Sequence, residues 1–224
     1  MPLILILVEC GLELIPKHIR DHPAVKKNLS SRIYSSQILD NSLHMSAMKN
    51  LKNKEKRGRP DIIHNCLLNA LGSPLNKNKN LIIYMHTINN KIFEFNTEIR
   101  IARNYNRFKG LMAKLLIDGS IEIDNLKLIT PFKGNLNKLI STFENPEVYI
   151  LTSKGKLINN FKDLFIQTID KDYVVIVGGF QKSNFSKEIL NISKNLISIS
   201  KYALDAWVAT NRIITYYELT YRIL

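Results

Sequence analysis

Short runs of consecutive apolar residues recur along the chain and predict β-strands. They cover 3–8, 81–86, 91–96, 148–151, 173–177 and 196–200. The runs at 3–8, 148–151 and 173–177 are apolar throughout rather than alternating, which favours a parallel sheet buried on both faces. Residues 87–90 separate two of the runs and end in Asn89-Asn90, which favours a hairpin because Asn tolerates positive φ in a tight turn.

Segments with apolar residues at three- and four-residue spacing lie between the strands and predict helices. They cover 43–51, 62–71, 108–116 and 204–217. Asn41 or Ser42 is available to cap the first helix, and Pro60 suits the first turn of the second because its missing N–H is not needed there. Strands that alternate with helices indicate an α/β fold. The chain shows no internal repeat and no linker, so we expect a single domain over 1–224.

The chain is strongly basic: its 224 residues include 32 Lys and Arg against 19 Asp and Glu, a formal net charge of +13. The hydrophobic fraction of 45% allows a substantial core and argues against global disorder. The excess charge favours a nucleic-acid partner, with an ordinary basic surface as the alternative. Charge alone does not decide between the two.

Cysteine usage and the N-terminal run bear on the compartment. Cys10 and Cys66 each lie in an apolar stretch without metal-ligand spacing, so we expect buried side chains, no disulfide framework and no metal site. The run 3–8 is too short to span a membrane and lacks the basic region and cleavage site of a signal peptide. These features predict a cytoplasmic protein with no membrane partner.

Arginines are concentrated in two segments, around 57–59 and over 100–107. Arg100, Arg103 and Arg107 are spaced by three and four residues, so that a turn and a following helix could aim them to one side. No acidic residue stands at the neighbouring helical positions, and the planar guanidinium suits phosphate. Tyr105 could stack on an unpaired base, whereas Phe108 fits the core better. We therefore expect an RNA-binding surface here.

Other candidate groups are ambiguous from local sequence. Asp61 could orient Arg59, act as a base, or be an ordinary first-turn carboxylate, and the last is the simplest interpretation. Gly178-Gly179 follows a buried strand, where backbone can approach a ligand, although a simple tight turn is the better interpretation from local sequence alone. His64 and His86 lie in apolar patterns typical of core residues. No nucleophilic triad is indicated by spacing.

The order of these motifs resembles the ribosome-biogenesis RNA methyltransferases that methylate N1 of a pseudouridine in small-subunit rRNA, a family of the SPOUT superfamily. The most specific motifs are Arg-Gly-Arg-Pro-Asp at 57–61 and Arg-Asn-Tyr-Asn-Arg-Phe at 103–108. Matching segments run almost end to end, at 7–16, 39–48, 62–77, 100–112, 177–180 and 197–207. The short chain resembles archaeal members.

The resemblance implies a mostly parallel α/β sheet with helices on both faces, a basic hairpin and loop elaboration around 49–107, and a C-terminal deep trefoil knot around 148–224. It implies a homodimer that binds S-adenosylmethionine and small-subunit rRNA, with room for ribosome-assembly factors or ribosomal proteins as further partners. The implied RNA-binding residues are Arg59, Arg100, Arg103 and Arg107, with Asp61 orienting Arg59. The implied cofactor-binding residues are Leu151, Thr152, Gly178, Gly179, Phe180, Ser183, Ile197, Ser198, Ile199, Ser200, Ala203 and Leu204.

Two points stay open within this resemblance. The loop 181–184 reads Gln-Lys-Ser-Asn, with Ser183 where the family has glycine, which restricts backbone freedom beside the implied cofactor. The alternative function is therefore a non-catalytic RNA-binding ribosome-assembly factor with weak or lost cofactor binding. Asp61 is the only acid that we nominate as a base, but a carboxylate paired with Arg59 makes a poor base, so we expect water or RNA to accept the proton.

Overall fold

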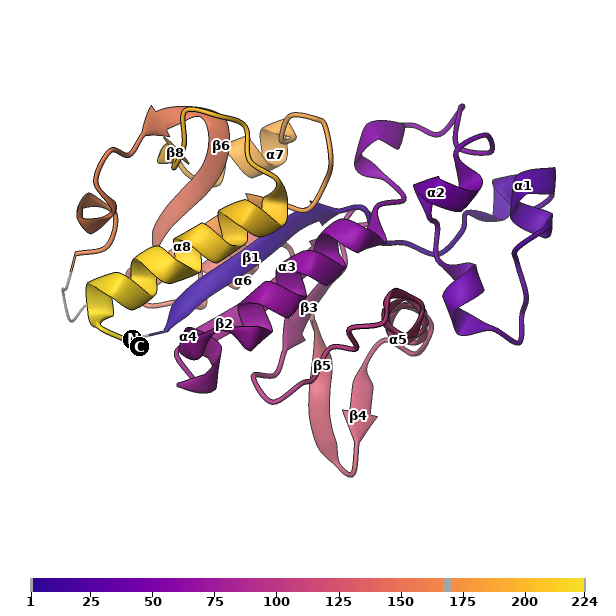
Figure 1. Cartoon of the computed structure of the whole chain (residues 1–224), viewed down its shortest axis with the longest axis horizontal. Helices are drawn as coiled ribbons and strands as arrows, with labels where there is room; N and C mark the ends of the chain where they lie inside the picture. The colour runs from indigo at the N-terminus through magenta and orange to yellow at the C-terminus, as the bar shows by residue number, and fades with distance from the viewer. Residues whose placement is uncertain (1, 167–170, 224) are drawn as a thin grey trace.

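The computed structural model describes residues 2–166 and 171–223. Within these residues, eight strands form one sheet in the order β4-β5-β3-β2-β1-β7-β6-β8 (Figure 1). The neighbouring strands β2, β1, β7, β6 and β8 run parallel, and β3, β5 and β4 continue the sheet antiparallel. The predicted α/β class and mostly parallel sheet are therefore confirmed.

The strands match the predicted apolar runs closely, with additions. Their bounds are β1 Leu3–Cys10, β2 Leu81–Thr87, β3 Ile92–Phe95, β4 Ile121–Ile123, β5 Leu126–Phe132, β6 Glu147–Leu157, β7 Tyr173–Gly178 and β8 Leu196–Ser198. The predicted hairpin is β2–β3, and Asn90 has the expected positive φ of 59°. The β4–β5 hairpin was not predicted; Asp124 and Asn125 form its turn with positive φ.

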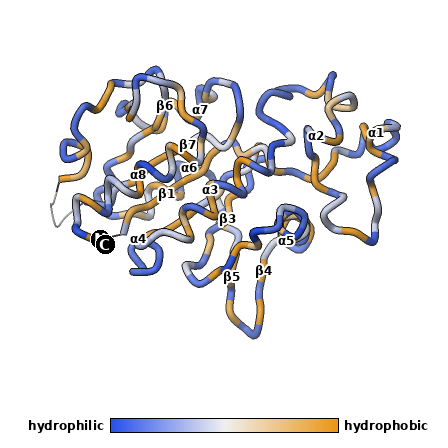
Figure 2. Tube along the Cα trace, viewed as in Figure 1, coloured by the Kyte–Doolittle hydropathy of each residue, from blue (hydrophilic) through white to orange (hydrophobic). Residues whose placement is uncertain are grey.

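Helices cover both faces of the parallel half, as its apolar strands require. The helix bounds are α1 Pro23–Lys26, α2 Asn41–His44, α3 Pro60–Gly72, α4 Pro74–Lys77, α5 Tyr105–Asp118, α6 Leu136–Ile140, α7 Lys187–Leu190 and α8 Ala206–Tyr221. Leu3, Leu5 and Leu7 of β1 belong to the core beneath α3, α5 and α8. Ile4 and Ile6 belong to a second core beneath α6 and α7. Figure 2 shows the hydrophobic residues concentrated along β1.

Residues 11–59, called the N-terminal lobe here, leave the sheet after β1 and return at α3 (Figure 1). The lobe has a small core of its own that includes Ile15, Val25, Leu39 and Met48. It contains α1, α2 and the 3-10 turns η1 Lys17–Ile19, η2 Tyr34–Gln37 and η3 Lys54–Lys56; a fourth such turn, η4 Phe161–Asp163, follows β6.

The predicted helix over 43–51 is wrong beyond His44, where α2 ends and the chain continues in turns. Its cap is neither Asn41 nor Ser42 but Asp40, whose Oδ1 accepts a hydrogen bond from the backbone N–H of Ser42 at 3.1 Å. Ala47, Met48 and Leu51, which follow α2, reach the small lobe core from these turns, whereas Leu43 is exposed. Within the described residues, no helix is long and apolar enough to cross a membrane.

Candidate functional site

A cavity of about 540 Å³ lies beside the ends of β7 and β8 and the middle of β6. Ligands of open α/β sheets bind outside the carboxyl ends of parallel strands, so this position is expected for a binding site. Every residue that the resemblance assigned to cofactor binding lines this one cavity, except Gly179. Segments around 151, 178–183 and 197–204 are thus brought together although they are far apart in sequence.

Gly178 and Gly179 serve different purposes. Gly178 lines the cavity, and a Cβ there would lie 2.8 Å from the Phe180 ring. Gly179 is buried behind the wall, where a Cβ would lie 2.5 Å from Cys10 Sγ and 2.7 Å from Ile63 Cδ1. Gly179 therefore permits close packing of the loop on β1 and α3 and does not itself line the cavity.

The loop 181–184 carries no glycine-type strain despite its unusual sequence. Outside glycine, positive φ occurs at eight positions of the described chain, and none of them lies in 181–184. Ser183 therefore adopts a conformation open to any residue, and the loop is tied to β6 by a hydrogen bond from Lys154 Nζ to Asn184 Oδ1 at 2.8 Å. The backbone argument for weakened cofactor binding is not supported.

The loop after β8 is fixed by its own polar contacts. Ser198 Oγ donates to the carbonyl of Ser200 at 2.7 Å, and the Tyr202 N–H donates to Ser200 Oγ at 3.0 Å. Arg212 of α8 donates through Nη1 to the carbonyl of Ile199 at 3.4 Å. These contacts preform one wall of the cavity. Leu151, Ile197, Ile199 and Leu204 make that wall largely apolar.

The cavity also includes residues that sequence reasoning missed. They are Lys154, Phe185 and Trp207 among others. Tyr202, within the expected segment 197–204, also lines the cavity and is 80% exposed, which is unusual for a large aromatic residue. The aromatic residues within the segment 197–207 were the sequence feature that could have identified Trp207 as a lining residue. Among the described residues, no group of three or more His, Cys, Asp or Glu side chains could hold a metal ion.

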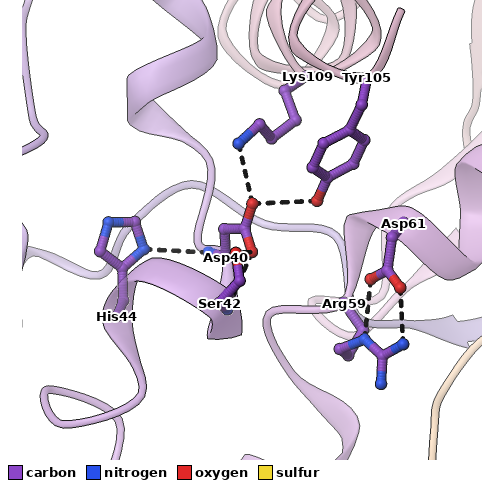
Figure 3. A network of polar contacts seen from close by, with 7 residues as sticks. All are labelled: Asp40, Ser42, His44, Arg59, Asp61, Tyr105 and Lys109. Atoms are coloured by element: carbon purple, nitrogen blue, oxygen red, sulfur yellow. Dashed lines mark hydrogen bonds and ion pairs between the residues drawn. The ribbon is translucent and has the colours of Figure 1, made fainter. Parts of the chain in front are cut away.

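Arg59 lines the same cavity and is held by Asp61. Its Nε donates to Asp61 Oδ1 at 2.8 Å and its Nη2 donates to Asp61 Oδ2 at 2.6 Å (Figure 3). The hydrogen bonds that Arg59 donates to Asp61 raise the pKa of Arg59 above its ordinary value, against the opposing effect of burial. Asp61 is in the first turn of α3, so the pair projects from a rigid helix start.

Arg100, Arg103 and Arg107 are all exposed, and none has an ion-pair partner in the described part of the chain. The helix begins only at Tyr105, so Arg107 lies in its first turn while Arg100 and Arg103 precede it. The three arginines thus lie on a turn and the helix that follows it, and no single helical face carries all of them. Arg59, Arg100, Arg103 and Arg107 are called the arginine surface below.

Tyr105 and Phe108 are both engaged within the protein. Phe108 is fully buried, as expected, and stacks on the ring of His64 at 4.4 Å between centroids. Tyr105 donates its hydroxyl hydrogen to Asp40 Oδ2 at 3.0 Å, and Lys109 Nζ lies 4.7 Å from the centre of its ring. A base-stacking role for Tyr105 is therefore not supported by this geometry.

The histidines and cysteines singled out in the sequence are core residues. His64 Nε2 lies 2.7 Å from the carbonyl of Ala102, and His86 Nδ1 accepts a hydrogen bond from the N–H of Glu9 at 3.3 Å. Cys10 and Cys66 are fully buried. Burial raises the pKa of the Cys66 thiol to about 12, so that it behaves as a small hydrophobe.

Comparison with known proteins places this arrangement among methyltransferases. The family model described as EMG1/NEP1 methyltransferase matches residues 5–218. A protein of Staphylothermus marinus named ribosomal RNA small subunit methyltransferase Nep1 is 41% identical, over 100% of this chain and 98% of its own length. A protein of the same name from Thermococcus kodakarensis is 38% identical over 96% of both. The crystal structure of Archaeoglobus fulgidus Nep1 bound to S-adenosylhomocysteine has a TM-score of 0.88 and 34% identity, covering 99% of this chain and 100% of the other.

Proposed function

The chain belongs to the EMG1/NEP1 methyltransferase family, and we propose that it transfers a methyl group from S-adenosylmethionine to N1 of a pseudouridine in a small-subunit rRNA loop during ribosome biogenesis. The names of the relatives support methylation of small-subunit rRNA, and the S-adenosylhomocysteine in the related crystal structure supports the cofactor. One observation of this structure carries the proposal: Arg59 of the arginine surface lines the same cavity as the implied cofactor residues. RNA and cofactor would therefore meet there.

The cavity fits the cofactor in size and chemistry. Its volume of about 540 Å³ lies within the range of about 300–1,000 Å³ that is usual for small-molecule sites. Leu151, Ile197 and Ile199 offer apolar surface for a purine ring, and Gly178 lets the backbone come close to a ligand. When bound, the cofactor supplies a methyl group already activated on a sulfonium.

The protein's own residues then have to bind, orient and exclude water. The arginine surface would bind phosphates on either side of the target, and the target base would be unstacked from its loop to reach the cavity. Asp61 orients Arg59 rather than acting as the base, because both of its oxygens accept hydrogen bonds from that guanidinium. The proton on N1 would pass to water or to the RNA.

Methylation at N1 is possible for pseudouridine and not for uridine. The ribose of pseudouridine is attached through a carbon atom, which leaves N1 with a proton that a methyl group can replace. In uridine, N1 is already bonded to the ribose and has no proton to lose. The test is incubation with the cofactor and two RNA loops that differ only in pseudouridine or uridine at one position. Mass spectrometry should find one added methyl on the pseudouridine loop alone. Methylation of both loops, or of neither, would contradict the proposal.

The alternative of a non-catalytic RNA-binding assembly factor was based on the sequence of the loop 181–184. The backbone of that loop has no positive φ angle, so its geometry gives no reason to expect weaker cofactor binding. Titration calorimetry with S-adenosylmethionine separates the two functions, since we expect saturable binding and the alternative predicts no heat at millimolar cofactor. The homodimer, the C-terminal knot, cytoplasmic localisation and further ribosome-assembly partners stay predictions. Light scattering of the purified chain checks the dimer directly.

A further inference from the structure

A buried polar cluster lies between α5 and the N-terminal lobe, close to the Arg59–Asp61 pair (Figure 3). Asp40 Oδ2 accepts hydrogen bonds from Lys109 Nζ at 2.8 Å and from the Tyr105 hydroxyl at 3.0 Å. Asp40 Oδ1 accepts from Ser42 Oγ at 2.6 Å. The side chains of Asp40 and Lys109 are only 6% and 7% exposed, so neither could contact RNA itself.

The residue after Asp40 connects this cluster to the segment that carries Arg59. The Asn41 N–H donates to the carbonyl of Gly58 at 2.7 Å. Gly58 has a φ of 64°, and a Cβ there would lie 2.9 Å from Met48 Cε and 3.2 Å from the Asn41 nitrogen. Asn41 and Met48 therefore fix the position of Gly58 closely. The backbone of Arg59, the next residue, is fixed with it.

Asp40 and Asn41 thus join two parts of the arginine surface. The side chain of Asp40 binds the first turns of α5, which follow Arg103 and include Arg107. The backbone of Asn41 binds the segment that ends at Arg59. A third contact, from His64 Nε2 to the carbonyl of Ala102, ties α3 to the loop before α5.

The stability of the fold does not by itself explain why two buried charges are present in this cluster. Removing two charges from water costs much of what their attraction returns, and an apolar replacement of similar volume is often as stable. Burial raises the pKa of the Asp40 carboxyl, but the hydrogen bonds from Lys109 and Ser42 outweigh it and hold the pKa below its ordinary value. The carboxylate stays charged and keeps several directional hydrogen bonds, which fix geometry more strictly than apolar contact does.

We propose that Asp40 is a positioning residue for RNA recognition. Through Lys109 and Tyr105 it sets the start of α5 relative to Gly58, so that Arg107 stands at a fixed place relative to Arg59. A preorganised arginine surface binds RNA more tightly because less conformational freedom is lost on binding. This inference rests on the proposed function, since the ligand of the surface is taken to be rRNA.

The mildest test removes only the hydroxyl of Tyr105. Affinity for the pseudouridine-containing RNA loop is measured for Tyr105→Phe, for Arg107→Ala and for the double variant. Loss of one hydrogen bond to a carboxylate should weaken RNA binding by about two- to tenfold in the otherwise unchanged protein. In the Arg107→Ala background the same change should cost less than about twofold, because the arginine that it positions is gone.

Tyr149 provides a matched control in a second cluster of the same chemistry. Its hydroxyl donates to Glu147 Oε1 at 2.6 Å, and Lys171 Nζ donates to Glu147 Oε2 at 2.7 Å. Tyr149→Phe therefore removes the same kind of hydrogen bond away from the arginine surface. We expect it to leave RNA affinity unchanged, which separates positioning from a general loss of stability.

The double variant Asp40→Asn with Lys109→Met removes both buried charges at once and should weaken RNA binding further while cofactor affinity stays the same. An equal loss for Tyr105→Phe with and without Arg107 would overturn the inference, as would a loss as large for Tyr149→Phe. If the unchanged protein neither binds nor methylates the RNA loop, the proposed function itself fails. RNA binding and methylation without coupling between Tyr105 and Arg107 would overturn only the positioning role.

Discussion

The carboxylate of Asp61 binds one edge of the Arg59 guanidinium with both of its oxygens, at 2.8 Å and 2.6 Å. This leaves Nη1 and the remaining N–H groups of Arg59 directed away from Asp61, where a phosphate or base oxygen can accept them. The pair is only partly buried, with the side chains of Arg59 and Asp61 20% and 37% exposed. Its value is therefore in orienting the guanidinium rather than in stabilising the fold.

Asp61→Asn tests this role. The amide can accept one of the two hydrogen bonds and loses the charge, so RNA affinity should fall by about 1 kcal/mol, roughly fivefold. The turnover rate at saturating RNA should change little, because we propose that Asp61 orients Arg59 and does not accept the proton. A fall of about a hundredfold or more in that rate, with RNA affinity retained, is the result expected of a general base and would contradict the orienting role. Arg59→Lys serves as the companion variant and should weaken RNA binding similarly, since lysine lacks the planar fork.

Arg100 and Arg107 are exposed, and neither has an acidic partner in the described residues, so each is free to bind phosphate. Arg100→Ala and Arg107→Ala should each weaken RNA binding and leave cofactor affinity intact. If each contacts one phosphate, the slope of log affinity against log salt should become shallower by about 0.7 for single-stranded RNA. Lys138→Ala, on α6 beneath the other face of the sheet, is the control and should change neither quantity. Unchanged RNA affinity in both arginine variants would remove the RNA-binding role of this surface.

The parallel core was predictable from the sequence because burial on both faces leaves a plain signature. The run 3–8 of β1 is apolar at every position, and its alternate side chains enter two different cores. α3 and α5 were predictable for a related reason, since one apolar stripe and a Pro or Asn start define each helix. The helix over 43–51 was not, because Ala47, Met48 and Leu51 reach a small lobe core from consecutive turns, and apolar residues at helical spacing do not distinguish such turns from a helix.

The sequence predicted most of the residues that line the cavity, but it did not predict the contacts that these and the neighbouring residues make. Motif resemblance named the residues that line the cavity, but only the fold shows that Gly179 is turned into the core against Cys10. From its place among the arginines, Tyr105 could have been an exposed residue that stacks on a base. In the structure its hydroxyl is bound to Asp40, sixty-five positions away in sequence. Contacts of such long range leave no local pattern, so composition and spacing cannot reveal them.

Gly155 is a further residue that no motif singled out, and it allows β6 and β8 to approach closely. A Cβ there would lie 2.5 Å from the nitrogen of Ile197 and 2.6 Å from the carbonyl carbon of Leu196, both backbone atoms that cannot turn aside. Gly155→Ala should therefore displace β8, which lines the cavity. We expect a loss of stability of about 1–3 kcal/mol together with about tenfold weaker binding of S-adenosylmethionine.

Gly110→Ala is the matched control for Gly155→Ala. Gly110 lies inside α5, and nothing stands within 4 Å of a Cβ built there. The same chemical change should stabilise the protein by up to about 1 kcal/mol, because alanine favours the helix, and cofactor affinity should not change. Urea unfolding and calorimetry measure both quantities. Equal cofactor affinity for the two variants would contradict the role assigned to the close approach of β6 and β8.

His44 and His86 are both buried and both accept a backbone hydrogen bond, which a protonated imidazole cannot do. His44 Nδ1 accepts from the N–H of Asp40 at 3.1 Å, and His86 Nδ1 accepts from the N–H of Glu9 at 3.3 Å. Burial lowers the pKa of both histidines below the ordinary value, although the nearby carboxylates of Asp40 and Glu9 act in the opposite direction. Each histidine is therefore held neutral in the folded protein.

Stability should consequently fall on mild acidification. A histidine with a lowered pKa contributes its full stability above the unfolded value of about 6.5 and loses it as the pH falls through the folded pKa. The free energy of unfolding should thus be smaller at about pH 5.5 than at about pH 7.5, while Asp40, with its lowered pKa, stays ionised across this window. In the double variant His44→Asn with His86→Asn, the amide oxygen can accept the same backbone hydrogen bonds and does not titrate, so this pH dependence should flatten. Urea unfolding at both pH values measures it, and an equally steep dependence in the double variant would show that other groups are responsible.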